Sequence, residues 1–293
     1  MEQDLGSLNR QAIETAREYT GALAWPTVVM VALVLAGLVA TLGLFAAGVL
    51  PLWAAILLYG ALTYLSYTPL HEAAHGNISG GNDRLQWLND LCGYLVAPLI
   101  MIPYSTHRVE HFTHHRYTNQ PDKDPDHMVS GMGGGFVAFV IVGLKFLWMQ
   151  NTFLFRDYWA TAPRRERLTY WAEVLVSLGW RTAFVLLVAR ESDLVLLVAG
   201  YVLGAFFTAY WFAYRPHHPY DNAARYRNTS SLIMPRWMKP LEWFWMGQNL
   251  HSIHHLFPRV PFYRYHAVHR RIEPILRAQG TPIIGLFSRR AVD

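Results

Sequence analysis

Cysteine is nearly absent from this 293-residue chain, whose only thiol is Cys92. A lone cysteine excludes a disulfide within the chain, a zinc ribbon and an iron–sulfur cluster held by the chain's own thiolates. A metal ion bound by this protein would therefore have to be held by histidine and carboxylate side chains.

Charged residues are also scarce, at 15% of the chain, whereas hydrophobic residues make up 53%. Together with 11 Trp and 16 Tyr, this composition is typical of a membrane protein with aromatic residues at the membrane interfaces. The net charge of +5 arises from basic residues dispersed between apolar runs. Because no basic helix or RNA-binding motif accompanies them, we expect membrane topology rather than nucleic-acid binding to explain them.

Four long apolar runs predict membrane-spanning helices that pair as two hairpins, residues 27–49 with 51–70 and residues 170–189 with 194–214. The first run has 23 uncharged residues, enough for a helix to cross the ~30 Å hydrocarbon core of a bilayer. The third run contains Glu173 and Arg181. A cation at mid-span is costly, so we expect Arg181 to pair with Glu173 or with a neighbouring helix.

Three further segments are expected to lie along the membrane surface. Residues 5–24 are polar with both signs of charge, which predicts an amphipathic surface helix and does not match a signal peptide. The apolar segment 85–104 is interrupted by polar residues and prolines, and we expect it to be re-entrant or interfacial, because a crossing would separate the histidines on either side of it. Residues 136–155 contain Lys145 and Gln150, so an interfacial helix is expected there.

The distribution of basic residues predicts the orientation of the spans. Nine Lys and Arg fall within residues 71–169 and twelve within residues 215–293, whereas Arg190 is the only one at the hairpin turns. Positively charged segments usually stay on the cytoplasmic side. We therefore expect one all-α membrane domain over residues 1–293, with cytoplasmic termini and a cytoplasmic helical cap of residues 71–169 and 215–293.

Histidine is abundant, and all 14 histidines fall in the expected cap. Eleven of them form four groups, HEAAH at 71–75, HRVEHFTHH at 107–115, RPHHP at 215–219 and HSIHH at 251–255. On a helix, spacings of three and four residues place imidazoles on roughly one face. One HxxHH could be an ordinary polar helix surface, but its recurrence in distant parts of the chain indicates a metal site.

The number of histidines indicates two metal ions rather than one. A zinc ion takes three or four protein ligands, so nine or ten imidazoles suit two ions. Nitrogen-rich ligation without thiolates suits iron, copper or zinc. The membrane setting, without an evident hydrolytic site, favours iron and dioxygen chemistry.

Two other functions remain as alternatives. HEAAH matches the HExxH pattern of zinc proteases, in which His71 and His75 would bind zinc and Glu72 would act as general base. That function leaves the histidines of both HxxHH segments unused. A metal transporter would be expected to carry its ligands within the spans near the middle of the bilayer, whereas these histidines lie just beyond the span ends.

The three segments HEAAH, HFTHH and HSIHH resemble the histidine boxes of the membrane fatty-acid desaturase superfamily. The pattern covers residues 63–266, and the expected spans fit the four-helix plan of that superfamily. The longer segments HHRYTNQPDKDPDHMVS, RPHHP with ARYRNTSS, and MGQNLHSIHHLFPRVPFYRYH are similar to the β-carotene hydroxylase branch, and more distantly to carotenoid ketolases. The resemblance implies a non-haem diiron oxygenase that oxidises an unactivated C–H bond of a lipophilic substrate. β-Carotene ring hydroxylation is the first expectation, and desaturation or hydroxylation of a fatty acyl chain is the alternative.

The resemblance also implies a set of metal ligands, which are His71, His75, His111, His114, His115, His217, His251, His254 and His255. Further polar residues are candidates for holding those imidazoles from behind, and these are His107, His218, Asp90, Glu110, Asp124, Asp126, Asn228 and Asn249. For His127, His266 and His269 we expect surface or capping roles.

Two iron ions, dioxygen as co-substrate and an external electron donor complete the function that the resemblance implies. Because a single cysteine cannot build an iron–sulfur carrier, we expect electrons from a ferredoxin-type or similar protein that docks on the basic cytoplasmic face. The substrate is expected to arrive laterally from the bilayer along aromatic residues, for which the candidates are Trp87, Trp148, Trp211, Trp237, Trp243 and Trp245. Sequence patterns do not indicate the oligomeric state.

Overall fold

The computed structural model describes residues 4–288 and 290–292, and most of these residues are helical. The α-helices are α1 (Leu5–Arg17), α2 (Trp25–Ala46), α3 (Leu52–Ala74), α4 (Gln86–Ile100), α5 (Tyr104–Tyr117), α6 (Phe136–Phe153), α7 (Arg164–Val188), α8 (Glu191–Thr208), α9 (Arg215–His217), α10 (His251–Leu256) and α11 (Tyr265–Gln279). Shorter 3-10 or π segments are η1 (Asp83–Leu85), η2 (Pro125–Gly134), η3 (Leu154–Tyr158), η4 (Ala209–Tyr214), η5 (Arg236–Trp245) and η6 (Phe262–Arg264).

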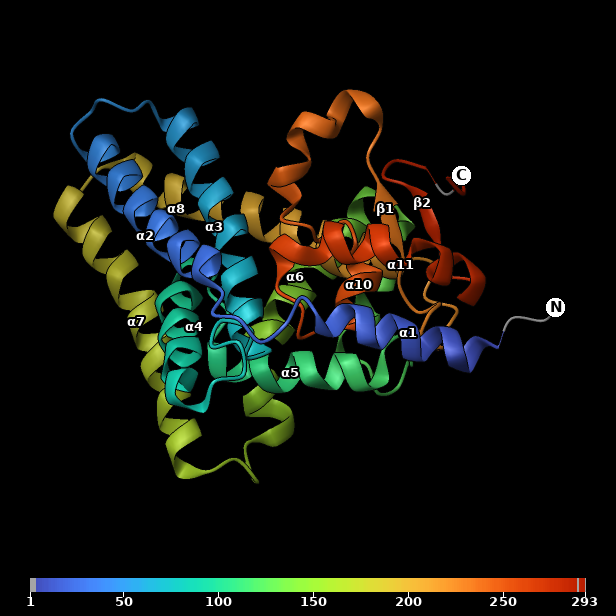
Figure 1. Cartoon of the computed structure of the whole chain (residues 1–293). Coiled ribbons are helices and arrows are strands. Elements are labelled where there is room, and N and C mark those ends of the chain that lie inside the picture. The colour runs from blue at the N-terminus through green and yellow to red at the C-terminus, as the bar shows by residue number, and fades with distance from the viewer. Residues whose placement is uncertain (1–3, 289, 293) are drawn as a thin grey trace.

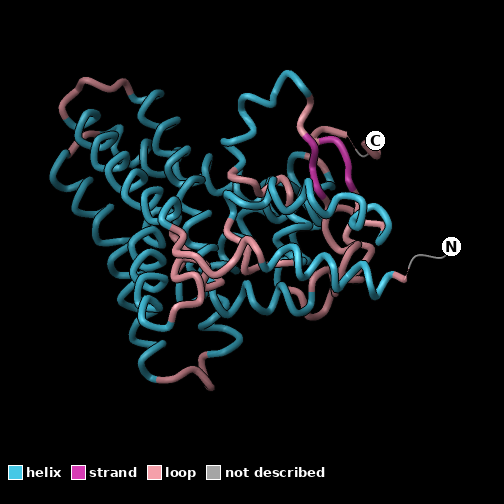
Figure 2. The backbone as a smooth tube through the Cα atoms, viewed as in Figure 1, coloured by secondary structure: helices cyan, strands magenta, loops and turns pink. Residues whose placement is uncertain are grey.

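The expectation of an all-α chain holds except for one short parallel strand pair. Strands β1 (Ser231–Ile233) and β2 (Ile283–Gly285) pair with Ser231 opposite Ile283, and Figure 2 shows them in magenta beside the C-terminal end. The pair ties the segment that follows α9 to the end of the chain.

The helices α2, α3, α7 and α8 lie side by side as a bundle, which fills the left of Figure 1. Helix α3 packs on α8, α4 and α2. Glycines bring α3 and α8 into close backbone contact, since a Cβ added to Gly204 would lie 2.3 Å from the carbonyl oxygen of Gly60. Small residues at helix crossings are the usual means of close packing in membranes, where water does not drive helices together.

Four helical segments among the described residues are long and apolar enough to cross a membrane, namely Trp25–Ala46, Phe136–Tyr158, Arg164–Val188 and Glu191–His217. Three of them coincide with the expected runs 27–49, 170–189 and 194–214. The second expected run, 51–70, forms α3 and falls outside this set, because Tyr, Thr and Ser are interspersed among its apolar residues. Its outer side chains, Trp53 and Leu57 among them, are nevertheless exposed.

Helix α6 differs from our expectation of an interfacial helix. Lys145 is its only charged residue, so α6 together with η3 has the length and hydropathy of a span. It packs against α5 and η2, the elements that follow the first bundle hairpin. One consequence is that α6 lines the space between the bundle and the histidine-bearing α5.

The expected re-entrant segment forms a sharp break between α4 and α5, which bend by 96°. Met101 at this break has φ +54°, in the left-handed region, and Pro103 precedes α5. Helix α4 ends here because Pro98 and Pro103 cannot donate backbone hydrogen bonds and because the left-handed Met101 cannot continue a helix. The break leaves the carbonyls at the end of α4 and the N–H groups at the start of α5 without partners inside their helices.

Helix α7 satisfies both ends of this break with one cation and one anion. The Arg181 guanidinium donates to the carbonyls of Pro98 (2.7 Å) and Leu99 (3.0 Å) at the end of α4. The Glu173 carboxylate accepts from the backbone N–H of Tyr104 and from Ser105 N (3.2 Å) and Oγ (2.6 Å) at the start of α5. Each charge faces the helix end whose dipole it complements.

These contacts answer the question that Arg181 raised in the sequence. It does not pair with Glu173; its guanidinium also donates to the Tyr59 hydroxyl of α3 (2.9 Å) and lies over the Trp180 ring (4.3 Å). A charged residue at mid-helix costs about 2.5–3.5 kcal/mol on insertion scales. Several hydrogen bonds to a charged group, each worth about 1.5–3 kcal/mol, offset that cost.

The remaining helices form the cap around the histidines. Helix α1 packs on α11, around a core that includes Ala12, Ile253 and Ile272. An ion pair between Glu18 and Arg271 joins the same two helices at the surface. Figure 1 places the ends of the chain on the cap side, away from the bundle.

Candidate metal centre

Histidines from four helices converge where the bundle meets the cap. Helix α3 supplies His71 and His75 at its end, and α5 supplies His111, His114 and His115 from one face. Helix α9 supplies His217, and α10 supplies His251, His254 and His255. All nine ligands that the family resemblance implies thus lie in one place. Seven of them are at most 8% exposed, while His115 and His255 are partly exposed.

The first group contains five histidines, His71, His75, His111, His115 and His254, with one ring nitrogen of each lying within 4.8 Å of the others. Neighbouring Nε2 atoms are 3.0 Å apart for His71 and His254, 2.9 Å for His75 and His111, and 2.7 Å for His115 and His254. We call this set the five-histidine group.

The second group is built around His114, His217 and His255, whose ring nitrogens also lie within 4.8 Å of one another. His251 joins it, because its Nε2 is 3.1 Å from that of His217 and 3.2 Å from that of His255. The Nε2 atoms of His114 and His255 are 3.3 Å apart. We call these four residues the four-histidine group. The rings of His115 and His255 stack at 4.3 Å, so the two groups adjoin.

These distances fit metal ligation. Nitrogens bound at about 2.0–2.1 Å to one ion lie about 2.8–3.0 Å from one another at octahedral angles and about 3.3–3.4 Å at tetrahedral angles. The nitrogen–nitrogen distances in both groups fall in or near these ranges. Each group therefore has the donor set and the spacing for one transition-metal ion.

Burial keeps most of these imidazoles neutral, as a metal ligand must be. Burial first, and neighbouring imidazoles second, hold the pKa values of His71, His111 and His254 well below the usual range. The same causes lower the pKa of His75 to about 3, with His107 and Arg259 as the nearby positive groups. Desolvation penalises the charged form, because imidazolium loses its hydration inside the protein.

His114 is the exception, and its neighbours explain why. Burial alone would lower the pKa of His114, but the carboxylates of Asp124 and Asp126 together outweigh it and raise that pKa. Its Nδ1 is 2.8 Å from Asp124 Oδ1. A carboxylate on Nδ1–H fixes the tautomer and leaves the Nε2 lone pair for a metal.

The loop behind the four-histidine group also positions the imidazole of His217. Asp124 also accepts from the backbone N–H of Asn119 (2.7 Å) and of Asp126 (2.9 Å). The Asn119 side-chain oxygen lies 3.2 Å from Nδ1 of His217, while its amide nitrogen donates to the carbonyls of Asn222 and Asn228. Asn119 has φ +62°, which an asparagine tolerates better than most residues.

His107 and Glu110, which were candidates for holding the imidazoles from behind, lie beside the two histidine groups. His107 is buried and stacks on His111 at 5.0 Å, with its Nδ1 3.7 Å from Glu110, but it belongs to neither group. Burial and the nearby Asp126 carboxylate raise the pKa of Glu110 well above its usual range. Together with Asp126 and Gln150, these residues form a polar cluster behind α5.

Glu72 does not face the imidazoles that flank it in the sequence. Its carboxylate accepts from the Asn77 side chain (3.1 Å), and burial raises its pKa to about 8 while a backbone hydrogen bond from Phe262 opposes that rise. The zinc-protease alternative needs Glu72 beside a water on the metal and leaves the other histidines idle. The structure instead places His71 and His75 among three further histidines, which counts against that alternative.

The remaining sequence candidates lie outside both groups. Asp90 is half-exposed near Arg108, and the Asn249 amide donates to the carbonyl of Leu232, so neither holds a clustered imidazole. The ring of His218 packs on Tyr214 and the ring of His127 on Tyr220. For His269 a surface or capping role was expected; it is buried, with Glu273 as its neighbour.

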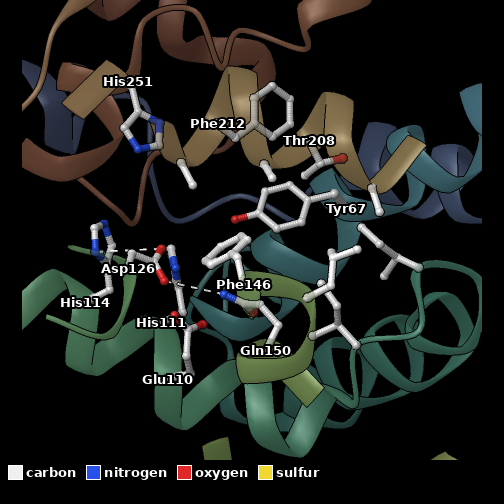
Figure 3. Close-up of a pocket in the computed structure, with 16 residues that line it drawn as sticks. Tyr67, Glu110, His111, His114, Asp126, Phe146, Gln150, Thr208, Phe212 and His251 are labelled. Carbon is white, nitrogen blue, oxygen red and sulfur yellow. Dashed lines mark hydrogen bonds and ion pairs between the residues drawn. The ribbon is translucent and has the colours of Figure 1, made fainter. Parts of the chain in front are cut away.

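A narrow cavity, about 30 Å³, opens between the two groups and the bundle (Figure 3). His111, His114 and His251 reach it from the cap, beside Glu110, Asp126 and Gln150. The opposite wall is mostly apolar and includes Tyr67, Phe146, Phe212 and the small residues Ala205 and Ala209. The narrow cavity is therefore bounded by imidazoles on one side and by hydrocarbon side chains on the other.

Several residues of the site carry no signal in the sequence. Tyr67 lines the cavity and stacks on His71 at 5.6 Å. The Tyr265 hydroxyl lies 3.1 Å from Nδ1 of His254, and the Thr118 hydroxyl lies 3.4 Å from Nδ1 of His255. Gln150 suggested only an interfacial helix. Apart from Thr118, which lies three residues after His115, their roles depend on contacts between distant segments.

Several known proteins with similar sequences are named as carotenoid ketolases or lipid desaturases. Zeaxanthin 4-ketolase of Chlamydomonas reinhardtii is 27% identical over 220 residues, which is 72% of this chain and 43% of the ketolase. Beta-carotene 4-ketolase 3 of Haematococcus lacustris is 30% identical over 152 residues, or 51% of this chain and 39% of that protein. An sn-1 acyl-lipid omega-3 desaturase (ferredoxin) of Nostoc sp. (strain 36) is 34% identical over 68 residues, or 23% of this chain and 18% of that protein. This chain thus covers less than half the length of each of these relatives.

The resemblance of the three histidine boxes extends to most of the chain. The family model described as Fatty acid desaturase matches residues 47–287, which include both histidine groups, the cavity and the bundle helices from α3 onward. This chain therefore belongs to the fatty acid desaturase family.

Proposed function

We propose that this protein is a membrane diiron oxygenase that oxidises an unactivated C–H bond of a lipophilic substrate, with β-carotene ring hydroxylation as its reaction. The observation that carries the proposal is the convergence of nine buried or partly buried imidazoles into two adjoining groups beside an apolar cavity. The family match and relatives named as ketolases and desaturases support an oxidoreductase.

The five-histidine group and the four-histidine group would each hold one iron through Nε2 atoms. Two irons at this site would supply reductive activation of dioxygen. Asp124, Asn119 and Tyr265 orient the ligand rings from behind. Outer partners of this kind commonly change metal affinity or activity by about 10–100-fold.

The protein's own contribution to the reaction is position. Tyr67, Phe146 and Phe212 form the wall that faces the imidazoles across the cavity. A substrate held against this wall exposes one methylene to the metal side, and that choice of carbon determines the product. Removal of one hydrogen from the substrate, followed by transfer of a hydroxyl group derived from dioxygen to the same carbon, gives an alcohol. Removal of a second hydrogen from the neighbouring carbon gives a double bond instead.

A carotenoid substrate is supported by two relatives named for ketolation of zeaxanthin and β-carotene. The histidine-box segments also resemble the carotenoid hydroxylase branch. The alternative is a fatty acyl desaturase or hydroxylase, which the relative named as an acyl-lipid desaturase favours. Both substrates present an apolar chain and both reactions need the same metal site, so the products formed distinguish them.

The proposed topology places the bundle in the membrane and the cap, with both termini, on the cytoplasmic side. The basic residues of segments 71–169 and 215–293 support this orientation. An external electron donor would then dock on the cap from the cytoplasm. One relative's name specifies ferredoxin, and exposed Arg164 and Arg165 would favour an acidic partner of that type.

Expression in a β-carotene-producing host, followed by pigment and fatty-acid analysis, tests the reaction. Hydroxylated carotenoids are the expected products. A ketone on the ring would indicate further oxidation of the same kind, while unchanged pigment together with new unsaturated acyl chains would replace the carotenoid by an acyl substrate. The empty vector and a His114→Ala variant are the controls.

Metal analysis of the purified protein tests the site separately. Two irons per chain are expected. A single zinc per chain with full activity would contradict the diiron proposal.

The electron donor is tested by reconstituted turnover at low and high salt, and with the double variant Arg164→Glu and Arg165→Glu. Attraction between exposed charges is screened by salt. Turnover that changes neither with salt nor in this variant would contradict an acidic partner on this face.

A further inference from the structure

A second and larger hollow lies beside the narrow cavity and opens on the face of the bundle. It has a volume of about 580 Å³ and lies between α6 and α7, with the α4–α5 break and α8 closing it. Its size falls in the ~300–1,000 Å³ range of small-molecule sites. We call it the α6–α7 cleft.

The cleft is lined almost entirely by apolar side chains. Leu144, Trp148 and Phe155 come from the α6 side, and Trp171 and Leu178 come from α7. These five side chains are each 47–67% exposed, on helical segments that are apolar enough to cross a membrane. The mouth of the cleft would therefore face lipid rather than water.

Polar side chains in the lining are already engaged by the protein backbone. Glu173 accepts from the N–H groups at the start of α5, and Ser177 donates to the Pro98 carbonyl. Asn151 and Thr152 donate to the carbonyls of Leu147 and Trp148 within α6. None of the described residues in the lining is Lys or Arg. The cleft thus offers a hydrocarbon surface and no cation for a phosphate or carboxylate.

One residue separates the cleft from the narrow cavity at the histidines. Leu147 lines both, and its side chain is only 9% exposed. The narrow cavity is too small for a substrate as it stands, because about 30 Å³ accommodates little more than a water molecule. A change of the Leu147 side chain toward another rotamer would join the two spaces.

We propose that the α6–α7 cleft admits the apolar end of a bilayer-dissolved substrate, and that Leu147 is the gate between this cleft and the metal centre. The proposal rests on the function proposed above and adds the route and the substrate class. The substrate is a lipid without a charged end, such as β-carotene, taken from the membrane rather than delivered from water by a charged carrier.

The first test is photolabelling of the protein in phosphatidylcholine vesicles that contain a trace of phosphatidylcholine with a diazirine on one acyl chain. Leu147 is buried, so a chain in the surrounding bilayer reaches it only through the cleft. Peptide mass spectrometry should find label at Leu147, and added β-carotene should suppress it. Label at Leu187, which is 84% exposed on α7, should persist.

Two variants on one helix make the test specific. Leu178→Trp adds bulk at the cleft mouth, while Leu175→Trp adds the same bulk three residues earlier, at a side chain that is 68% exposed and lies outside the cleft. Leu178→Trp should lower both the Leu147 label and product formation several-fold, and Leu175→Trp should lower neither. Leu147→Trp should abolish product formation while iron content stays that of the wild type; if this variant does not fold, Leu178→Trp carries the test.

The outcomes separate the route from the reaction. No label at Leu147, or equal label and equal product in the Leu178 and Leu175 variants, would overturn the cleft. If added β-carotene does not suppress the label at Leu147, a bilayer lipid is the only occupant of the cleft, and the proposed substrate route is overturned. The wild-type protein could also show the expected labelling pattern but oxidise neither β-carotene nor acyl lipid. That result would reject the proposed function, while the cleft would still be a lipid-binding site.

Discussion

The two histidine groups adjoin each other but are held in different ways. The four-histidine group lies against the loop after α5, where Asp124, Asn119 and Thr118 each face one Nδ1 atom. The fourth member of that group, His251, has no hydrogen-bond partner for its Nδ1 among the described residues. In the five-histidine group, Nδ1 of His254 faces the Tyr265 hydroxyl, while Nδ1 of His71 likewise has no partner among those residues. Its rings are instead fixed by packing, with His71 against Tyr67 and His75 against Phe112.

This difference shows two ways of orienting an imidazole. A hydrogen bond to Nδ1, especially from a carboxylate, fixes both ring angle and tautomer. Helix packing fixes the ring angle alone. Four histidines of the five-histidine group lie at the end of α3 or on α5, where neighbouring side chains pack against their rings. We therefore expect the four-histidine group to depend on single polar side chains and the five-histidine group to depend on the ligands themselves and on helix geometry.

The largest effects should come from removing one ligand in each group. His111→Ala in the five-histidine group and His217→Ala in the four-histidine group should each lose one of the two irons and nearly all product formation, a loss beyond the ~10–100-fold typical of outer partners. Iron analysis and product assays measure both. His266→Ala is the matched control, since His266 lies in neither group. If the His217→Ala protein kept its full iron content, the assignment of His217 as a metal ligand would be contradicted.

A smaller effect is expected from Asp124→Asn, which keeps the shape of the side chain but removes its charge. The variant should lose about 10–100-fold in activity or iron affinity, because Asp124 holds His114 and two backbone N–H groups at once. Asp122→Asn, at an exposed position of the same loop, is the control. An Asp124→Asn protein with wild-type iron affinity and turnover would show that packing alone also holds the four-histidine group.

Tyr265→Phe should have a weaker effect on the five-histidine group. It removes a neutral hydroxyl 3.1 Å from Nδ1 of His254, and neutral hydrogen bonds are about half as strong as charge-assisted ones. Activity should therefore fall less than in Asp124→Asn, while thermal unfolding stays close to that of the wild type. If Tyr265→Phe proved the more damaging of the two, the comparison between the groups would be reversed.

The smallest effect should come from Glu72→Gln. Burial raises the pKa of Glu72 to about 8, so the carboxyl group is largely neutral near pH 7 and glutamine resembles it. Product formation and iron content should remain close to the wild type, because the side chain faces Asn77 rather than the imidazoles. Abolished activity with retained iron would instead give Glu72 the general-base role that HExxH enzymes assign to it.

Much of the architecture followed from local patterns. Apolar length predicted α2, α7 and α8 as spans, and the interruptions at residues 85–104 predicted an element that does not run straight through. Residues 136–155 were expected to be interfacial because of Lys145 and Gln150, yet α6 with η3 has the length and hydropathy of a membrane-spanning helix. Arg181 was recognised as costly, but its partners are carbonyls of a broken helix, which no pattern within α7 could indicate.

The sequence by itself determined which atoms were available at the site. A single cysteine left imidazoles and carboxylates as the donors. Spacings of three and four residues put the imidazoles on common helix faces, because a helix repeats every 3.6 residues. Only the tertiary structure decided how the imidazoles divide into five and four, how Asn119 and Tyr265 come to stand behind them, and where Leu147 separates cleft from cavity. These features depend on contacts between helices far apart in the chain, and such contacts follow from packing rather than from the period of any one helix.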